Sequence, residues 1–241
     1  MAKKKSTKKR NYDPPKESTG DTLHTLARAG VSSVPIVGGA ANEFFQAVIV
    51  PPLRKRQAEW MEEIAGGIRD LEARQQCVME ELSENDAFLD TVLHASQTAT
   101  RTANVDKRNA LRNAVLNAAL PNPPDESKQQ LFIQFVDTLT VWHIRLLELL
   151  IDPLAWFERN NKQPVQINIL GTLQKMILGA FPELQGEDDF IEQCVSDLQT
   201  RGLLTNFNYH TNMGGQGIYE SRGTRLGQQF IDFVTAPMFD D

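Results

Sequence analysis

The chain has 241 residues, a formal net charge of −6, two cysteines and four histidines. A length of this order with an ordinary apolar fraction indicates one or two globular domains and excludes disorder of the whole chain. The cysteines, Cys77 and Cys194, are too few for a disulfide framework or a zinc site built from thiolates. We therefore expect a protein of a reducing compartment, located in the cytoplasm.

The first 28 residues form a basic segment without apolar periodicity. Residues 1–30 hold eight Lys or Arg and three acidic residues, a net charge of +5, which leaves −11 on the remainder of the chain. Such a composition predicts a disordered tail over residues 1–28, which either solubilises the protein or contacts an anionic partner. Nucleic acid and anionic lipid are the candidate partners of this tail. Its candidate contact residues are Lys3, Lys4, Lys5, Lys8, Lys9 and Arg10.

Residues 29–53 are the most apolar part of the chain, but glycine and proline interrupt them. The longest uninterrupted helix, about residues 40–50, is half of the roughly 20 residues that a bilayer span needs, so no transmembrane span is predicted. One face of this helix is apolar, as in an amphipathic helix. That face either covers the core or contacts a membrane surface or a partner's groove. It consists of Phe44, Phe45, Val48 and Ile49.

The next helices complete a helical domain over residues 29–120. Apolar residues from position 53 recur in a 4-3 spacing, which predicts one helix of about 30 residues with a coiled-coil-like seam. The seam includes Trp60, Ile64, Leu71 and Val78. At Gly66-Gly67 we expect a bend or a close helix crossing. A second helix over 86–102 forms an antiparallel hairpin with the first, and a third covers 105–120.

A second domain, residues 125–236, follows the proline cluster at 121–124. Asp125 caps a strongly apolar helix over 126–150, which we expect to be the core helix of this half. Three further helices are predicted, and after them two short strands, joined by a polar, glycine-containing turn, form a hairpin before a last helix. The predicted ranges are 153–160, 167–180 and 187–203 for the helices, 203–209 and 218–221 for the strands, and 224–234 for the last helix.

Two stretches of this half carry a resemblance: "LQTRGLLTNF" at residues 198–207 and "IYESRGTRLGQQFIDFV" at residues 218–234. They resemble the end of a winged-helix domain, in which a helix ends in "GLL", a β-wing follows and a last helix packs back. The resemblance covers residues 126–235 and implies a helix-turn-helix topology, without assigning a ligand. The expected fold class is therefore mainly α, with an N-terminal helical hairpin or coiled-coil-like unit followed by a winged-helix-like domain that contains a small β-hairpin.

No pattern of catalytic or metal-binding residues is present in the sequence. The histidines lack the paired spacing of a helical metal site, and His143 beside Trp142 is typical of a core histidine with satisfied hydrogen bonds. Residues 214–217 are glycine-rich but lack the Lys-Ser/Thr of a phosphate loop, so they predict a flexible wing tip. We expect no enzyme activity, no cofactor and no bound metal.

The helix at the recognition position, residues 187–203, has five acidic residues against Arg201 alone, a net charge of −4. Phosphates would repel this helix, although Arg222 and Arg225 flank the wing and are candidate contacts for an anionic partner. The leading hypothesis is a non-enzymatic protein-interaction or regulatory protein that binds a protein partner or a second copy of itself. The alternatives are a nucleic-acid-binding transcriptional regulator and a peripheral membrane protein without a transmembrane span.

Overall fold

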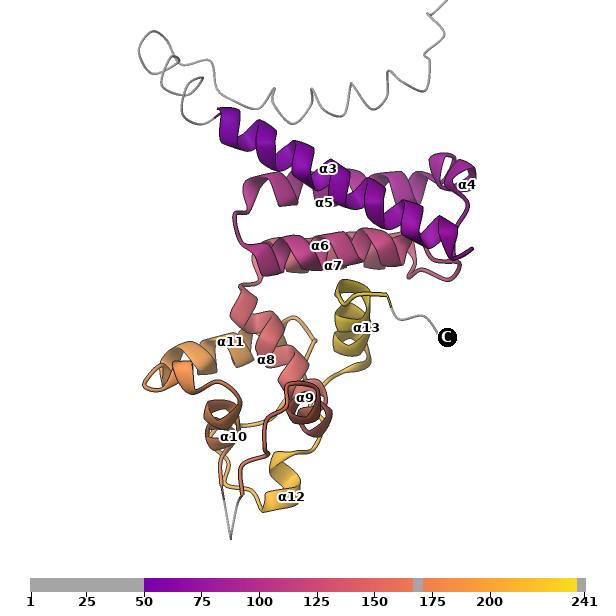
Figure 1. Cartoon of the computed structure of the whole chain (residues 1–241). Coiled ribbons are helices and arrows are strands. Elements are labelled where there is room, and N and C mark those ends of the chain that lie inside the picture. Colours follow the sequence, from indigo (N-terminus) through magenta and orange to yellow (C-terminus); the bar gives the residue numbers. More distant parts are fainter. Residues whose placement is uncertain (1–49, 167–170, 238–241) are drawn as a thin grey trace, which may run out of the picture. The chain divides into compact units, whose positions relative to one another are not determined.

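The computed structural model describes residues 50–166 and 171–237, which form eleven α-helices and one 3-10 helix (Figure 1). The chain divides into two units, residues 1–51 and 52–241, and of the first unit only the two residues that begin α3 are described. The expectation of a mainly α-helical protein is confirmed. The elements are α3 (Val50–Ala73), α4 (Met79–Ser83), α5 (Asp86–Arg101), α6 (Val105–Ala118), α7 (Glu126–Thr138), α8 (Val141–Ile151), α9 (Pro153–Arg159), α10 (Leu173–Ala180), η2 (Pro182–Leu184), α11 (Asp188–Thr200), α12 (Gly215–Ile218) and α13 (Arg225–Val234).

Helix α3 packs on α5 and α6, and its pair of glycines sets how closely it approaches α6. The indole N–H of Trp60 donates to Ser96 Oγ of α5 at 2.9 Å. A Cβ added to Gly67 would lie 2.7 Å from Leu116 Cδ2 of α6, whereas one added to Gly66 would meet nothing within 4 Å. The close crossing expected at this pair is therefore confirmed, and Gly67 is the residue that allows it.

The prediction of one helix from residue 53 to about residue 82 is wrong. Helix α3 ends at Ala73, because the backbone becomes left-handed at Gln75, with a φ of 58°. The predicted seam is divided accordingly: its members on α3 are buried, but Val78, which lies beyond the turn, is 47% exposed. The seam residues on α3 belong to the hydrophobic core of this chain, which accounts for their apolar spacing without a second chain.

The single core helix predicted over residues 126–150 is instead two helices. Asp125 caps α7 as expected, since its carboxylate accepts the backbone N–H of Lys128 at 3.1 Å. The chain then becomes extended at Leu139 and Thr140, with ψ angles of 146° and 166°. The Thr140 N–H donates to Nδ1 of His143 at 3.2 Å, so this side chain takes the donor that a continuous helix would have used. Residues 121–124, the expected domain boundary, connect α6 to α7, and these two helices pack together.

The small β-hairpin of the expected winged-helix domain is not confirmed. Within residues 50–166 and 171–237 the structure has no strand, only isolated antiparallel bridges between Gly171 and Met213 and between Leu204 and Gly223. Residues 215–218 form the short helix α12. Side chains take the carbonyl groups that the predicted strands would use: the Gln199 amide donates to the carbonyls of residues 205 and 207, and the Arg222 guanidinium donates to those of residues 217, 218 and 220.

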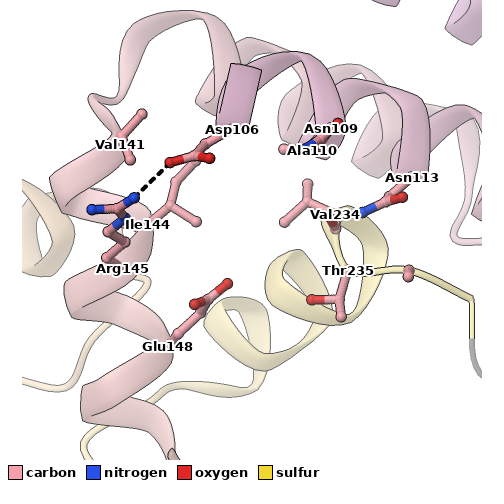
Figure 2. A pocket seen from close by; sticks show the side chains of 11 residues that line it. Asp106, Asn109, Ala110, Asn113, Val141, Ile144, Arg145, Glu148, Val234 and Thr235 are labelled. Carbon is pink, nitrogen blue, oxygen red and sulfur yellow. Dashed lines mark hydrogen bonds and ion pairs between the residues drawn. The ribbon is translucent and has the colours of Figure 1, made fainter. Parts of the chain in front are cut away.

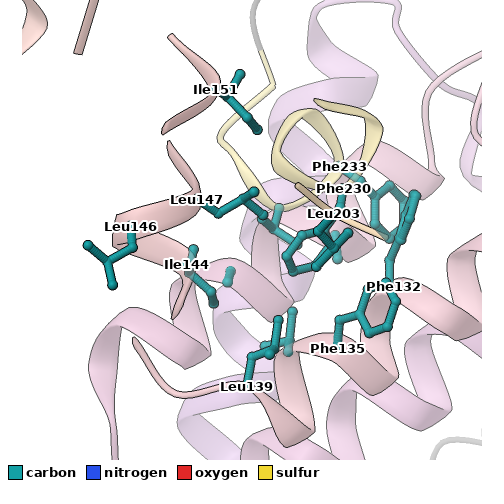
Figure 3. Packing of buried hydrophobic residues seen from close by; sticks show 14 of the residues in the cluster. Phe132, Phe135, Leu139, Ile144, Leu146, Leu147, Ile151, Leu203, Phe230 and Phe233 are labelled. Carbon is teal, nitrogen blue, oxygen red and sulfur yellow. The ribbon is translucent and has the colours of Figure 1, made fainter. Parts of the chain in front are cut away.

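Helix α13 returns to the middle of the fold and packs against α6 and α8. Its Phe230 ring lies 5.6 Å from the rings of both Phe132 and Phe135 of α7, measured between centroids (Figure 3). The side-chain amide of Asn117 of α6 donates to the carbonyls of Phe233 at 2.9 Å and of residue 235 at 2.8 Å. These contacts fix α13 against α6 and α7.

Candidate functional site

A cleft of about 300 Å³ opens where α6, α8 and the end of α13 meet (Figure 2). Its apolar lining includes Ala110 of α6, Ile144 of α8 and Val234 of α13, all of which are buried. Its polar lining comes from three parts of the chain. Helix α6 contributes a carboxylate and two amides, α8 contributes a cation and a carboxylate, and the chain after α13 contributes a hydroxyl. These polar residues are Asp106, Asn109, Asn113, Arg145, Glu148 and Thr235.

Asparagine side chains of α6 and of the residue before it position two walls of the cleft, α6 and the end of α13. Asn104 caps α6 by accepting the backbone N–H of Lys107 at 3.0 Å, which places Asp106 in the first turn, where the helix dipole favours a carboxylate. The side-chain amide of Asn113, which lies about two helical turns after Asp106 on α6, donates to the Val234 carbonyl at 3.0 Å. The cleft wall formed by α13 is therefore hydrogen-bonded directly to the wall formed by α6.

Asp106 and Arg145 form an ion pair across the mouth of the cleft, with 2.7 Å between Oδ2 and Nη2. Their side chains are 51% and 42% exposed, so the pair contributes little to stability, on the order of 0–1 kcal/mol. The Arg145 guanidinium also lies over the ring of Trp142, 5.2 Å from its centroid. These two contacts occupy the guanidinium of Arg145, which is the only cation among the described residues that line the cleft.

Glu148 lies one helical turn from Arg145 and has its carboxylate in the cleft (Figure 2). Among the residues that the structure describes, it has no hydrogen-bond or ion-pair partner within normal contact distance. Burial raises the pKa of this carboxyl, an effect that nearby Arg159 and Arg145 oppose and that Asp106 reinforces. Glu148 is thus a half-buried acid without a direct partner, which is an unfavourable position for a residue with only a structural role.

The acidic character predicted for the helix at residues 187–203 is visible on the surface of α11. Glu187, Asp188, Asp189 and Glu192 are all exposed. His210 Nε2 lies 3.1 Å from Glu192 Oε2, a contact that connects α11 to the segment before α12. This face presents negative charge to solvent, which opposes binding to a phosphate backbone.

The candidate residues named from the sequence are not brought together by the described structure. Arg222 is buried, and its guanidinium is occupied by backbone carbonyls and by the Phe207 ring, 5.4 Å from the centroid. Arg225 is exposed at the start of α13. The other candidates, Lys3, Lys4, Lys5, Lys8, Lys9 and Arg10 in the tail and Phe44, Phe45, Val48 and Ile49 in the apolar segment, lie outside the described residues.

Sequence reasoning did not identify the cleft, although one signal for it was present. Helix α8, with the sequence VWHIRLLELLI, carries just two charged residues, Arg145 and Glu148, on an otherwise apolar helix, and both line the cleft. A charged residue on a buried apolar helix needs a partner or a function. That signal locates the wall formed by α8. The residues that complete the cleft, such as Asp106 on α6 and Val234 on α13, are more than about 30 residues away along the chain.

His143 occupies the position expected of a core histidine. Its ring is buried, with Nδ1 bonded to Thr140 and Nε2 lying 3.3 Å from Asp197 Oδ2. Within the described part of the chain, no group of His, Cys, Asp or Glu is arranged to hold a metal ion. None of the helices over residues 50–166 and 171–237 has both the length and the hydropathy needed to cross a membrane.

No protein-family model, no curated protein and no solved structure matches this chain. No relative therefore supplies a function for the cleft.

Proposed function

We propose that this chain is a non-enzymatic protein-interaction protein, which binds a partner protein over the surface where the cleft between α6, α8 and α13 opens. The observation that carries the proposal is Glu148, a half-buried carboxylate in a cleft with no direct partner among the described residues. Charged groups kept in unfavourable surroundings inside a cleft are concentrated at functional sites.

The composition of the cleft favours binding over catalysis. Its lining combines a buried apolar floor with amide, hydroxyl and carboxylate groups, and its described residues include no Ser, Cys or His that would serve as a nucleophile. A volume of about 300 Å³ is at the small end of ligand pockets. It suits one side chain of a partner protein better than a nucleotide or a large metabolite.

Charge also favours a protein partner over nucleic acid. The face of α11 that a winged helix would present to DNA exposes four carboxylates, and Arg222, which was a candidate phosphate contact, is buried. We further propose that residues 125–236 have a winged-helix-like arrangement and that the protein is located in the cytoplasm. In this arrangement, α10 and α11 form the helix pair, and the bridge between Leu204 and Gly223 stands where the wing begins.

Photo-crosslinking in cells of the native host tests the proposal. Asn109, an exposed residue at the rim of the cleft, is replaced by p-benzoylphenylalanine, and Glu158, an exposed residue of α9 away from the lining, is replaced in a control. We expect a discrete adduct with one protein from position 109 and none from position 158. The adduct should disappear in a Thr235→Arg background, because the larger cationic side chain fills the cleft.

Two results would contradict the proposal. Equal labelling of many proteins from both positions would indicate nonspecific contact. An adduct that disappears after nuclease treatment would support the nucleic-acid alternative instead.

A further inference from the structure

The polar groups of the cleft include two carboxylates, which can only accept hydrogen bonds when ionised, and side-chain oxygens of two amides and a hydroxyl. Among the lining residues that the structure describes, two carboxylates, Asp106 and Glu148, accompany one cation, Arg145, so their formal charge is −1 when all three are ionised. Arg145 is already committed to Asp106 and to the Trp142 ring. An entering group therefore meets negative charge and acceptor oxygens from more than one helix.

We propose that the cleft binds a primary ammonium group, the side-chain amine of a lysine that the partner protein inserts between Glu148 and Asp106. The inference rests on the proposed function, because it names the partner's anchoring group at that same site. The apolar floor of Ala110, Ile144 and Val234 would contact the methylene stem of the lysine, since such stems pack along apolar surface while the charged end stays with polar groups.

The positions of the acceptors favour an ammonium over other cations. Asp106 approaches from α6, Glu148 from α8 and Thr235 from the end of α13 (Figure 2). An ammonium has three N–H bonds that diverge in space and can reach acceptors on three helices, whereas the donors of a guanidinium all lie in one plane. A trimethylated amine has no N–H donor and is bound instead by aromatic faces. The described residues that line the cleft include no aromatic ring.

Binding of a cation should depend on pH through Glu148. The charged groups near this carboxyl are Asp106 on α6, Arg145 on α8 and Arg159 on α9, and burial together with Asp106 raises its pKa. An ammonium interacts favourably with the ionised carboxylate and not with the neutral acid. The affinity should therefore be greatest at neutral pH and above, and decrease as the pH falls through the raised pKa of Glu148.

The test uses the full chain and N-acetyl-lysine methylamide as the probe. Chemical-shift titration of the backbone amides should show saturable binding with a dissociation constant on the order of 1 mM, as expected for so small a ligand. The shifted amides should be those of the cleft, such as residues 109, 145 and 235. Glu148→Gln should weaken binding about tenfold or more, and the matched variant Glu158→Gln on exposed α9 should leave it unchanged.

A stability measurement separates loss of the site from loss of the fold. Because ionised Glu148 is unfavourable in the folded state, Glu148→Gln should raise the melting temperature at pH 7 by about 1–3 °C while it removes binding. Binding of the probe by Glu148→Gln as tightly as by wild type would overturn the inference. So would a probe that shifts no cleft amide at 20 times the expected dissociation constant, roughly 20 mM.

Two related probes test the choice of cation. The trimethyl-lysine derivative should bind at least about tenfold more weakly than the lysine derivative, because it has no N–H donor. Equal or tighter binding of the trimethyl-lysine or of the arginine derivative would contradict the ammonium assignment.

The inference and the proposed function fail in different ways. A specific crosslink from position 109 without binding of the lysine probe would overturn the ammonium inference and leave the protein-interaction function standing. Absence of both the crosslink and the binding of the lysine probe would overturn the proposed function together with the ammonium inference.

Discussion

The Nε2 atom of His143 lies 3.3 Å from Asp197 Oδ2, and this contact joins the first turn of α8 to α11. The Thr140 backbone N–H donates to the other ring nitrogen, Nδ1, so the proton of the neutral imidazole is on Nε2 and is donated to Asp197. Both nitrogens of the buried ring are therefore used, and the ring fixes the break between α7 and α8 as well as the position of α11.

We predict that His143 makes the fold sensitive to mild acid. Burial lowers the pKa of this imidazole, with Arg201 and Lys107 acting in the same direction and Asp197 opposing them. The unfolded chain takes up the proton below about pH 6.5 while the folded chain resists it, so stability falls as the pH decreases from about 7 to 5.5. In His143→Gln this part of the profile of melting temperature against pH should be flatter.

The control is Gln134→Ala, which alters an exposed, uncharged residue of α7 and should keep the wild-type profile. An unchanged pH profile in His143→Gln would show that the sensitivity arises elsewhere.

The two neighbouring glycines of α3 should respond oppositely to alanine. A Cβ at Gly66 meets nothing within 4 Å, so Gly66→Ala should stabilise the protein by about 0.5–1 kcal/mol through helix propensity. A Cβ at Gly67 lies 2.7 Å from Leu116 Cδ2, so Gly67→Ala should lose that gain or destabilise the fold by about 1–3 kcal/mol. Urea unfolding of both variants measures the difference, and equal stabilisation would disprove the close crossing.

Gly227 permits the contact between the start of α13 and the segment after α11. A Cβ at this position would lie 2.1 Å from the carbonyl oxygen of Leu203, a backbone atom that cannot move alone. Gly227→Ala should therefore destabilise the protein by about 3 kcal/mol or more. Gly214→Ala, with no atom within 4 Å of the added Cβ, should stay within about 1 kcal/mol of wild type in the same thermal-unfolding assay.

Arg222 should act as a structural residue and Arg225 as a surface residue. The Arg222 guanidinium donates to the carbonyls of Gly217 and Glu220, each at 2.6 Å, and Arg222→Ala would leave these groups without their donor. We expect Arg222→Ala to lower the free energy of unfolding by about 2–4 kcal/mol, and Arg222→Lys to have a stability between those of wild type and Arg222→Ala. Arg225→Ala should change it by less than about 0.5 kcal/mol, and similar losses for both variants would contradict this assignment.

Features that depend on a few neighbouring residues could be predicted from the sequence. Asp125 caps α7 as expected, and α5 begins at the expected residue, Asp86, after Asn85, whose side chain accepts the N–H of Phe88 at 3.1 Å. Such caps act within one helical turn, so the sequence contains all the participants. The apolar period likewise identified the buried face of α3, which includes Trp60, Ile64 and Leu71.

Features that depend on distant side chains could not be predicted. The apolar pattern continues through residues 139–140, and only the position of His143 next to α11 shows why the helix breaks there. The residues 203–209 and 218–221 have strand-like composition, but Gln199 and Arg222 take their carbonyls in three dimensions. The cleft is similar, because its charged residues come from separate helices and no spacing along the chain connects them.

The position of α13 has a consequence for how the chain folds during synthesis. The partners of Phe230 and of the α13 carbonyls, Phe132 and Asn117, are made about a hundred residues earlier. Helices α5 to α7 can associate as they leave the ribosome, but their phenylalanine surface stays uncovered until α13 has been translated. That interval is when the nascent chain is most exposed to aggregation and to chaperone capture.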